Sequence, residues 1–276
     1  DCTPTVKCID YTLGLNENQK ICFEKSLNSR YYMVHGPPGT GKTKTLSAIC
    51  SHLAFNENLK VLVCSPSNAG VDNMISGILK LRMDLNKVVR LGNPSRVLDT
   101  NSNVVLDVLL KKELKSNKDY RVLKIKLTSL KDSKGGGRSS EYYDTLRELR
   151  VMEKIALEQI LRESMVIACT LTGIMSKELK NVLFKNSHSS LYFDVVIIDE
   201  AGQALNELLI MGVAIGKRVI LAGDHLQLPP SFQNREIEKT YSTFFEQLIG
   251  FHEKNLNCGD FLTMLVLQYR MHKHIM

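Results

Sequence analysis

The sequence predicts an α/β fold: a parallel sheet with helices on both faces and an inserted antiparallel helical stalk. Short, nearly continuous apolar runs rich in β-branched residues alternate with helical stretches, which is typical of parallel strands buried on both faces. A complete phosphate-binding pattern, at residues 36–43, joins the first such run to the next helical stretch. One long segment, 103–162, contains no strand-like run and is rich in Lys, Glu and Leu.

The composition is that of a globular protein, with 276 residues, 43% hydrophobic and 24% charged. A net charge of +7 favours a polyanionic partner such as nucleic acid, although many basic domains bind none. The seven cysteines include no C-x-x-C pair, so we expect reduced thiols and a location in the nucleus or cytoplasm. The N-terminal residues lack signal-peptide character, and no apolar run approaches the ~20 residues that span a bilayer, so we expect no membrane segment.

Seven runs are predicted to form strands, and each ends before a polar or small-residue segment. They are 31–34, 61–64, 88–91, 165–169, 194–198, 218–222 and 262–267. The first is followed by the phosphate-binding pattern and then by a helix from about Thr43 to Phe55. Because ligands of such sheets bind at the carboxyl ends of the strands, the segments just after these runs are the candidate site.

The segment 103–162 is predicted to form two antiparallel helices that project from a sheet domain made of 1–102 and 163–276. One apolar stripe is formed by Leu123, Leu127 and Leu130, and another by Leu146, Leu149, Met152 and Ile155. Between them, 132–140 is a Gly/Ser-rich linker. A stalk without a function of its own is the alternative, and the origin of the glycine run at 135–137 is left open.

The phosphate-binding pattern assigns a role to each residue type within one loop. Its members are Gly36, Pro37, Pro38, Gly39, Thr40, Gly41, Lys42 and Thr43. The glycines let backbone N–H groups converge on a chain of phosphates, and Lys42 can reach the β- and γ-phosphates. The Thr43 hydroxyl is a ligand for Mg²⁺, and the helix that begins here adds the positive end of its dipole. We also assign Lys44 to the nucleotide site.

Two adjacent carboxylates follow the apolar strand predicted at 194–198. In proteins with this phosphate loop, the first acid after such a strand holds Mg²⁺ directly or through water, and here that acid is Asp199. The second, Glu200, can orient and deprotonate the attacking water. A single aspartate would suit a kinase or a GTPase, whereas the pair indicates ATP hydrolysis. The chain has no Asn-Lys-x-Asp guanine signature, which argues against GTP.

Other polar turns follow the remaining strands. Gln227 lies in a turn that continues into Pro229 and Pro230, and its amide could sense the γ-phosphate. The segment 65–73 opens a helix with hydroxyl and amide groups, which suits a phosphate backbone and equally suits helix capping. A similar polar strand end lies at 168–173.

Taken in order, GPPGTGKT, SPSNAGVDN, DEAGQA, GDHLQLPPS and QYRMHKHIM resemble the motifs of the Upf-like branch of superfamily 1 helicases. The immunoglobulin-mu-binding-protein and senataxin group within that branch is especially similar, and the resemblance covers nearly the whole chain. It implies the first RecA-like domain of a monomeric, ATP- and Mg²⁺-dependent motor that translocates 5′-to-3′ on single-stranded RNA or DNA and unwinds duplexes.

The resemblance also implies roles for individual residues. Gln19 would read adenine, Tyr269 would stack on it, and Arg270 would contact the γ-phosphate, together with the catalytic set of Lys42, Asp199, Glu200 and Gln227. The residues expected near single-stranded nucleic acid are Pro66, Ser67, Asn68, Thr170 and Pro229. Family members continue past the QYRM motif into a second RecA-like domain. Without that domain, residues 1–276 are expected to hydrolyse ATP very slowly.

Two other functions compete with the motor. A truncated domain could bind nucleic acid or a protein partner without efficient turnover, although the intact Lys42, Asp199 and Glu200 argue against degeneracy. A kinase with this loop would need an Arg-rich lid, which the sequence does not show, and it would leave the Gln-Leu-Pro-Pro turn unexplained. The sequence does not distinguish RNA from DNA as the natural track.

Overall fold

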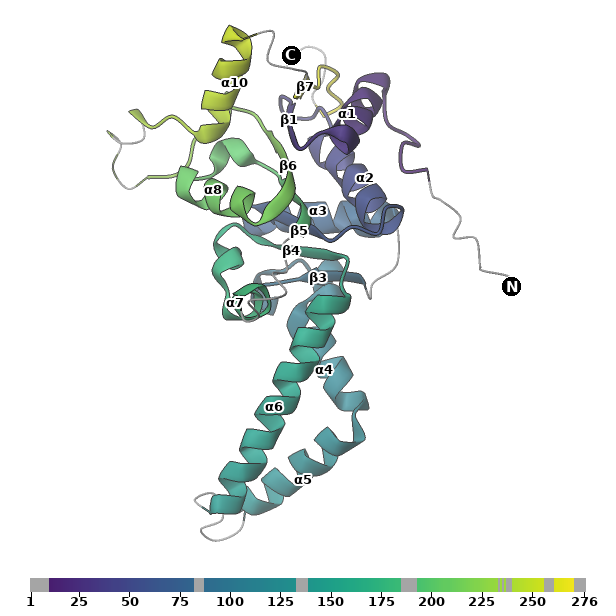
Figure 1. Ribbon diagram of the computed structural model, residues 1–276, viewed down its shortest axis with the longest axis vertical. Coiled ribbons are helices and arrows are strands. Elements are labelled where there is room, and N and C mark those ends of the chain that lie inside the picture. Colours follow the sequence, from purple (N-terminus) through teal and green to yellow (C-terminus); the bar gives the residue numbers. More distant parts are fainter. Residues whose placement is uncertain are drawn as a thin grey trace, which may run out of the picture.

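A seven-stranded, entirely parallel sheet forms the centre of the computed structural model, with the strand order β3-β4-β2-β5-β6-β1-β7 (Figure 1). The structure describes residues 10–81, 87–132, 139–184, 193–232, 234, 236, 240–255 and 261–270. The strands are β1 Tyr31–His35, β2 Val61–Ser65, β3 Val88–Arg90, β4 Val166–Thr170, β5 Phe193–Ile198, β6 Gly216–Gly223 and β7 Leu262–Met264. The predicted parallel α/β fold is confirmed.

The last strand is shorter than predicted. Residues 265–267 continue the apolar run, but only Leu262–Met264 belongs to β7. The Leu265 N–H still donates to the carbonyl of His35, the last residue of β1, at 2.7 Å, and the chain then passes the phosphate loop, where the Tyr269 N–H donates to the Gly39 carbonyl at 2.9 Å. The apolar pattern predicted a longer strand because it does not encode this contact with a distant loop.

Helices cover both faces of the sheet. Outside the stalk they are α1 Glu17–Asn28, α2 Lys42–Phe55, α3 Asn68–Leu81, α7 Lys177–Phe184, α8 Asn206–Ala214 and α10 Phe244–Lys254. Alternate strand residues face opposite sides: Val63 packs in the cluster that contains Leu46 of α2, whereas Leu62 packs with Leu209 of α8. No helix in the described part of the chain is long and apolar enough to cross a bilayer.

The stalk projects from the sheet on the β3 and β4 side and consists of three helices instead of two (Figure 1). Its first arm is divided into α4 Leu106–Ser116 and α5 Lys118–Asp132, and the returning arm is α6 Ser140–Glu163. Asn117 separates the first two, and its side-chain oxygen accepts a 3.0 Å hydrogen bond from the Tyr120 N–H at the start of α5. The two-helix prediction was wrong at this point because an asparagine caps a new helix there.

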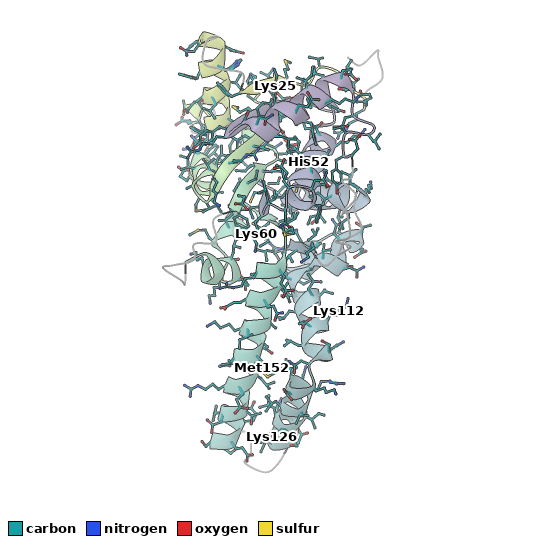
Figure 2. All side chains as sticks on the ribbon, turned by 45° about the vertical axis from the view of Figure 1, so that its right-hand side comes forward. Lys25, His52, Lys60, Lys112, Lys126 and Met152 are labelled. Carbon is teal, nitrogen blue, oxygen red and sulfur yellow. The ribbon has the colours of Figure 1, made fainter. Side chains whose placement is uncertain are left out.

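The stalk has its own small apolar core. Leu114, Tyr120 and Leu149 are buried in it, with Leu110, Leu123, Leu127, Met152 and Ala156 packed against them. Ile155 is 59% exposed, so its assignment to the stripe was wrong; the 3.6-residue period places Ala156 there instead. Lys126 of α5 and Glu141 of α6 form an exposed ion pair of 2.8 Å near the tip, and Figure 2 shows Lys126 and Met152 along these arms.

Candidate nucleotide site and nucleic-acid face

The phosphate loop lies between the end of β1 and the start of α2. Gly39 and Gly41 have φ angles of 80° and 82°, which a side chain would strain. At Gly41 a Cβ atom would also lie 2.5 Å from Nε2 of Gln19. Lys42 is buried, and its ammonium group donates to the Gly36 carbonyl at 2.5 Å, so the charge lies inside the curl of the loop. The loop is therefore shaped for an anionic ligand.

A cavity of about 290 Å³ opens over this loop and joins four segments of the chain. Its lining residues are Pro38, Gly39, Thr40, Gly41, Lys42, Thr43, Glu200, Gln227, Tyr269 and Arg270. Residues predicted from separate motifs thus meet at the carboxyl edge of one parallel sheet, because β1, β5 and β6 are neighbours there.

The predicted magnesium ligands lie in contact at the rim of this cavity. The Thr43 hydroxyl donates to Oδ2 of Asp199 at 3.0 Å, and the Glu200 N–H donates to Oδ1 of the same carboxylate at 2.9 Å. Burial, together with the nearby Glu200 carboxylate, raises the pKa of Asp199 to about 6. Hydroxyl and carboxylate oxygens are the ligands that Mg²⁺ prefers, so the pair fits that ion, whose charge would favour the ionised form of Asp199.

Glu200 has left-handed backbone geometry, with a φ of 56°, which is uncommon for a residue with a side chain. It lies two residues past the end of β5, Ile198, and directly precedes a short helix, Ala201–Gln203. The Gln203 amide group approaches its carboxylate at 3.5 Å. The backbone turn lets Asp199 stay buried while the adjacent Glu200 lines the cavity.

Gln227 is held by Asp224, a residue that the sequence analysis did not assign. The Gln227 amide donates to Oδ2 of Asp224 at 3.0 Å, and the Leu226 N–H donates to Oδ1 at 3.0 Å. Asp224 thus organises the turn after β6, as an aspartate often does through hydrogen bonds to residues that follow it. Two residues beyond Gln227, Pro229 is exposed, whereas Pro230 is buried.

A second cavity, of about 450 Å³, lies beside the first and contains Gln19, Lys44 and Tyr269 among its lining residues. The Gln19 amide donates to the Thr40 carbonyl at 2.9 Å and accepts from the Asn16 N–H at 3.1 Å. Tyr269 is 65% exposed, and its hydroxyl accepts from the Asn16 side chain at 2.7 Å. Lys44 donates to the Gly14 carbonyl. Asn16 is a further residue of the site that the sequence analysis did not assign, although its position as a helix cap is visible in the sequence.

The predicted nucleic-acid residues are brought together in part. Ser65 of β2 pairs with Thr170 of β4, so the segments that follow these two strands lie side by side. Asn68 and Thr170 line a third cavity, of about 460 Å³, with Asn93 among its other lining residues. Ser67 is exposed and caps α3 by accepting from the Gly70 N–H at 3.0 Å.

Pro66 precedes Ser67 and is half-buried. Pro229 lines none of the three cavities and follows β6, which β5 separates from β2. The ends of β2 and β4 therefore bring Asn68 and Thr170 to one cavity, whereas Pro229 lies in a separate exposed turn.

The AAA domain family matches residues 14–138 and 128–235 of the chain. The chain belongs to the Upf-like superfamily 1 helicases. It matches the first domain of these proteins. Three relatives are similar along almost the whole chain. DNA polymerase alpha-associated DNA helicase A of Schizosaccharomyces pombe is 35% identical over 95% of this chain and 38% of its own. DNA-binding protein SMUBP-2 of Mus musculus is 32% identical over 99% of this chain and 27% of its own. ATP-dependent helicase upf1 of Schizosaccharomyces pombe is 31% identical over 94% and 26%.

This Upf-like domain thus spans well under half of the length of those relatives. The family match and the parallel sheet agree on a RecA-like fold around a phosphate loop. The motif patterns assigned no role to Asp224, which lies in GDHLQLPPS, or to His35, which precedes the phosphate loop. Their proximity follows from the pairing of His35 with Gly223 in adjacent strands.

Gln19→Ala in this Upf-like domain is expected to lower the preference for ATP over GTP by about tenfold. The Gln19 side chain accepts from the Asn16 N–H and donates to the Thr40 carbonyl, which leaves one amide N–H and one oxygen lone pair for a ligand. A donor and an acceptor side by side are the groups that read an adenine edge. Competition binding with a fluorescent nucleotide measures the ratio, and the exposed Gln247 of α10 provides the control Gln247→Ala. Equal losses for ATP and GTP would instead assign Gln19 to holding the phosphate loop through Thr40.

Proposed function

We propose that this Upf-like domain is the ATP-binding part of a motor that couples ATP hydrolysis to 5′-to-3′ translocation on single-stranded RNA or DNA. The observation that carries the proposal is the cavity of about 290 Å³ in which Lys42, Thr43, Glu200, Gln227 and Arg270 meet. The motifs that contribute these residues are dispersed in the sequence, and a domain without turnover would not need all of them in one place.

The chemistry proposed for the cavity is hydrolysis at the γ-phosphate. Lys42 and Arg270 neutralise the phosphate charge that develops in the transition state. Thr43 and Asp199 would hold Mg²⁺, which would supply positive charge to the phosphates of the nucleotide. Glu200 orients the attacking water and accepts its proton.

Recognition of the base and coupling to the track use neighbouring parts of the same sheet edge. Gln19 and Tyr269 would hold adenine in the adjoining cavity. On the other side, Asn68 and Thr170 face a cavity that suits a sugar-phosphate backbone, with Ser67 and Pro66 beside them. The turn that carries Gln227 also carries the exposed Pro229, so a shift driven by the γ-phosphate would reach the nucleic-acid face within two residues.

We also propose that 1–102 and 163–276 form the motor domain and 103–162 an inserted stalk. A second RecA-like domain in the full-length protein would supply further arginines to the γ-phosphate from the open side of the cavity. The same proposal includes a monomeric protein that acts in the nucleus or the cytoplasm.

The ATPase rate with and without single-stranded nucleic acid tests this function. The full-length protein is expected to be stimulated by single strands, and Lys42→Ala is expected to abolish turnover, because it removes the one ammonium group inside the loop. Residues 1–276 alone should be slower by about 10³–10⁵-fold, the range that arginines supplied to the γ-phosphate contribute in related enzymes. Robust duplex unwinding by residues 1–276 would contradict the proposed motor. So would an ATPase rate that single strands do not raise and that Lys42→Ala does not lower.

Affinity for single strands is expected to fall steeply with salt and to depend little on base sequence. The chain carries a net charge of +7, and single strands release counterions with a log–log slope of about −0.7 per phosphate contacted. Fluorescence anisotropy with homopolymer and mixed-sequence oligonucleotides, across a potassium chloride series, measures both properties. A flat salt dependence would count against the nucleic-acid face.

A further inference from the structure

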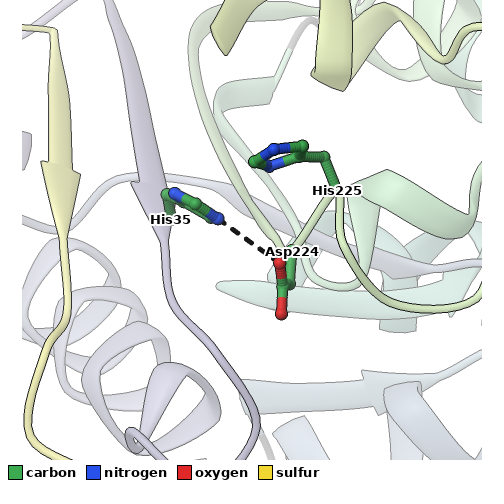
Figure 3. A group of neighbouring side chains, drawn as sticks. All are labelled: His35, Asp224 and His225. Carbon is green, nitrogen blue, oxygen red and sulfur yellow. Dashed lines mark hydrogen bonds and ion pairs between the residues drawn. The ribbon is translucent and has the colours of Figure 1, made fainter.

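His35, Asp224 and His225 converge at the point where the phosphate loop and the Gln227 turn meet (Figure 3). His35 is the last residue of β1 and lies opposite Gly223, the last residue of β6, so the two residues after Gly223 follow directly beside it. One potential ligand atom from each of the three side chains lies within 4.8 Å of the other two. Among the residues that the structure describes, this is the only such group of His, Cys, Asp or Glu.

The spacing of these atoms is close to that of a metal site. A tetrahedral ion with ligand bonds of about 2.0–2.1 Å places its donor atoms about 3.4 Å apart. Nε2 of His35 lies 3.3 Å from Oδ1 of Asp224, and the two imidazole rings are 4.9 Å apart between centroids. The ligand atom of His225 lies within 4.8 Å of the other two, and the paired ends of β1 and β6 place His35 beside the turn that carries Asp224.

The surroundings of His35 and Asp224 act on the two groups in different ways. Burial lowers the pKa of His35 below its usual value, although the hydrogen bond with Asp224 opposes this shift. Burial opposes ionisation of Asp224, but hydrogen bonds from Gln227, Leu226 and His35 outweigh it and lower the pKa of the carboxyl. The positive charge of Lys42 lowers the pKa of His35 and would repel a cation bound nearby. The negative charge of Asp224 acts in the opposite direction.

His225 provides an independent observation. Its Nδ1 atom is buried and has no hydrogen-bond partner, although buried polar atoms are nearly always paired. The His35–Asp224 hydrogen bond alone would not require a second imidazole here, whereas an ion would satisfy Nδ1.

We propose that His35, Asp224 and His225 form a site for a divalent transition-metal ion, for which Zn²⁺ is the probe. Two imidazoles and one carboxylate are a ligand set that suits Zn²⁺ and related ions and is poorly suited to Mg²⁺. The site is separate from the Thr43–Asp199 pair, whose ligands are all oxygens. The ion would connect the end of β1 to the end of β6 and would hold the turn that carries Gln227 through Asp224.

Titration of the 276-residue chain with Co²⁺, after treatment with a chelator, tests the site. One equivalent is expected to give a visible absorption band that Zn²⁺ removes and that excess Mg²⁺ leaves unchanged. His225→Ala and His35→Gln are each expected to weaken Zn²⁺ affinity by about tenfold or more. Zn²⁺ should also raise the thermal midpoint of the wild-type chain and not that of His225→Ala.

The matched control is His52→Gln. His52 also faces a carboxylate, with Nε2 3.4 Å from Oε1 of Glu57, but within the described part of the chain it belongs to no group of three potential ligands. His225→Ala removes a ring nitrogen without a hydrogen bond, so it tests the site even if His35→Gln impairs folding. His52→Gln is expected to bind Zn²⁺ as tightly as the wild type. The proposal is overturned if no Co²⁺ band forms, or if His225→Ala also binds Zn²⁺ as tightly as the wild type.

Discussion

Glu200→Gln is expected to leave ATP binding intact and to slow hydrolysis by about 10²–10⁴-fold, the usual contribution of a positioned general base. Glutamine keeps the size of the side chain and can still accept the weak contact from Gln203, but it cannot take a proton from water. The proposed magnesium ligands Thr43 and Asp199 remain in contact, so nucleotide should still bind.

The full-length protein is the material for this measurement, because turnover in residues 1–276 alone is expected to be slow. Steady-state hydrolysis gives the rate, and the thermal shift with ATP and Mg²⁺ gives binding. Glu207→Gln is the control, since Glu207 is exposed in the first turn of α8 and lines none of the cavities described above. Hydrolysis near the wild-type rate in Glu200→Gln would assign the proton transfer to another group.

Asp72→Ala is expected to lower the free energy of unfolding by about 3–5 kcal/mol, because it leaves the Arg90 charge buried and without its counterion. The two side chains are almost fully buried, and Nε of Arg90 lies 3.0 Å from Oδ1 of Asp72. Asp72 also accepts from the Leu98 N–H at 3.1 Å, and its carbonyl accepts from Asn101 at 2.8 Å. The pair therefore joins α3 and β3 to the segment that leads into the stalk.

Chemical unfolding monitored by circular dichroism measures the loss, with Lys217→Ala as the contrast. Lys217 forms an ion pair of similar length with Asp194, 2.8 Å, but its own side chain is 66% exposed, so its removal should cost at most about 1 kcal/mol. Arg90 also donates to Oδ1 of Asn68 at 2.9 Å, so Asp72→Ala should weaken single-strand binding as well. Equal stability losses in the two variants would show that burial does not decide the strength of the Arg90–Asp72 pair.

Local patterns predicted the elements of this domain well, because they depend on periodicity and on single residue types. The apolar runs located all seven strands, since parallel strands buried on both faces must be apolar nearly throughout. The phosphate loop and the Asp199–Glu200 pair were readable because their chemistry requires specific residues at fixed spacing. The bounds of the elements were harder to predict: β7 ends at Met264, before the chain reaches the phosphate loop at Tyr269, and the first arm of the stalk divides at Asn117.

The sequence by itself determined the fold class, the phosphate loop and which side chains are suited to nucleotide chemistry. Only the tertiary structure decided which of them meet. Gln19 reaches Thr40, Arg90 pairs with Asp72, and His35 contacts Asp224 across 189 residues of chain, because strand order and register bring these positions together. Such contacts cannot be read from sequence periodicity, because the two partners lie far apart in the chain and each fits the helix or strand pattern of its own segment. The burial that strengthens these contacts arises only when the sheet and its helices assemble.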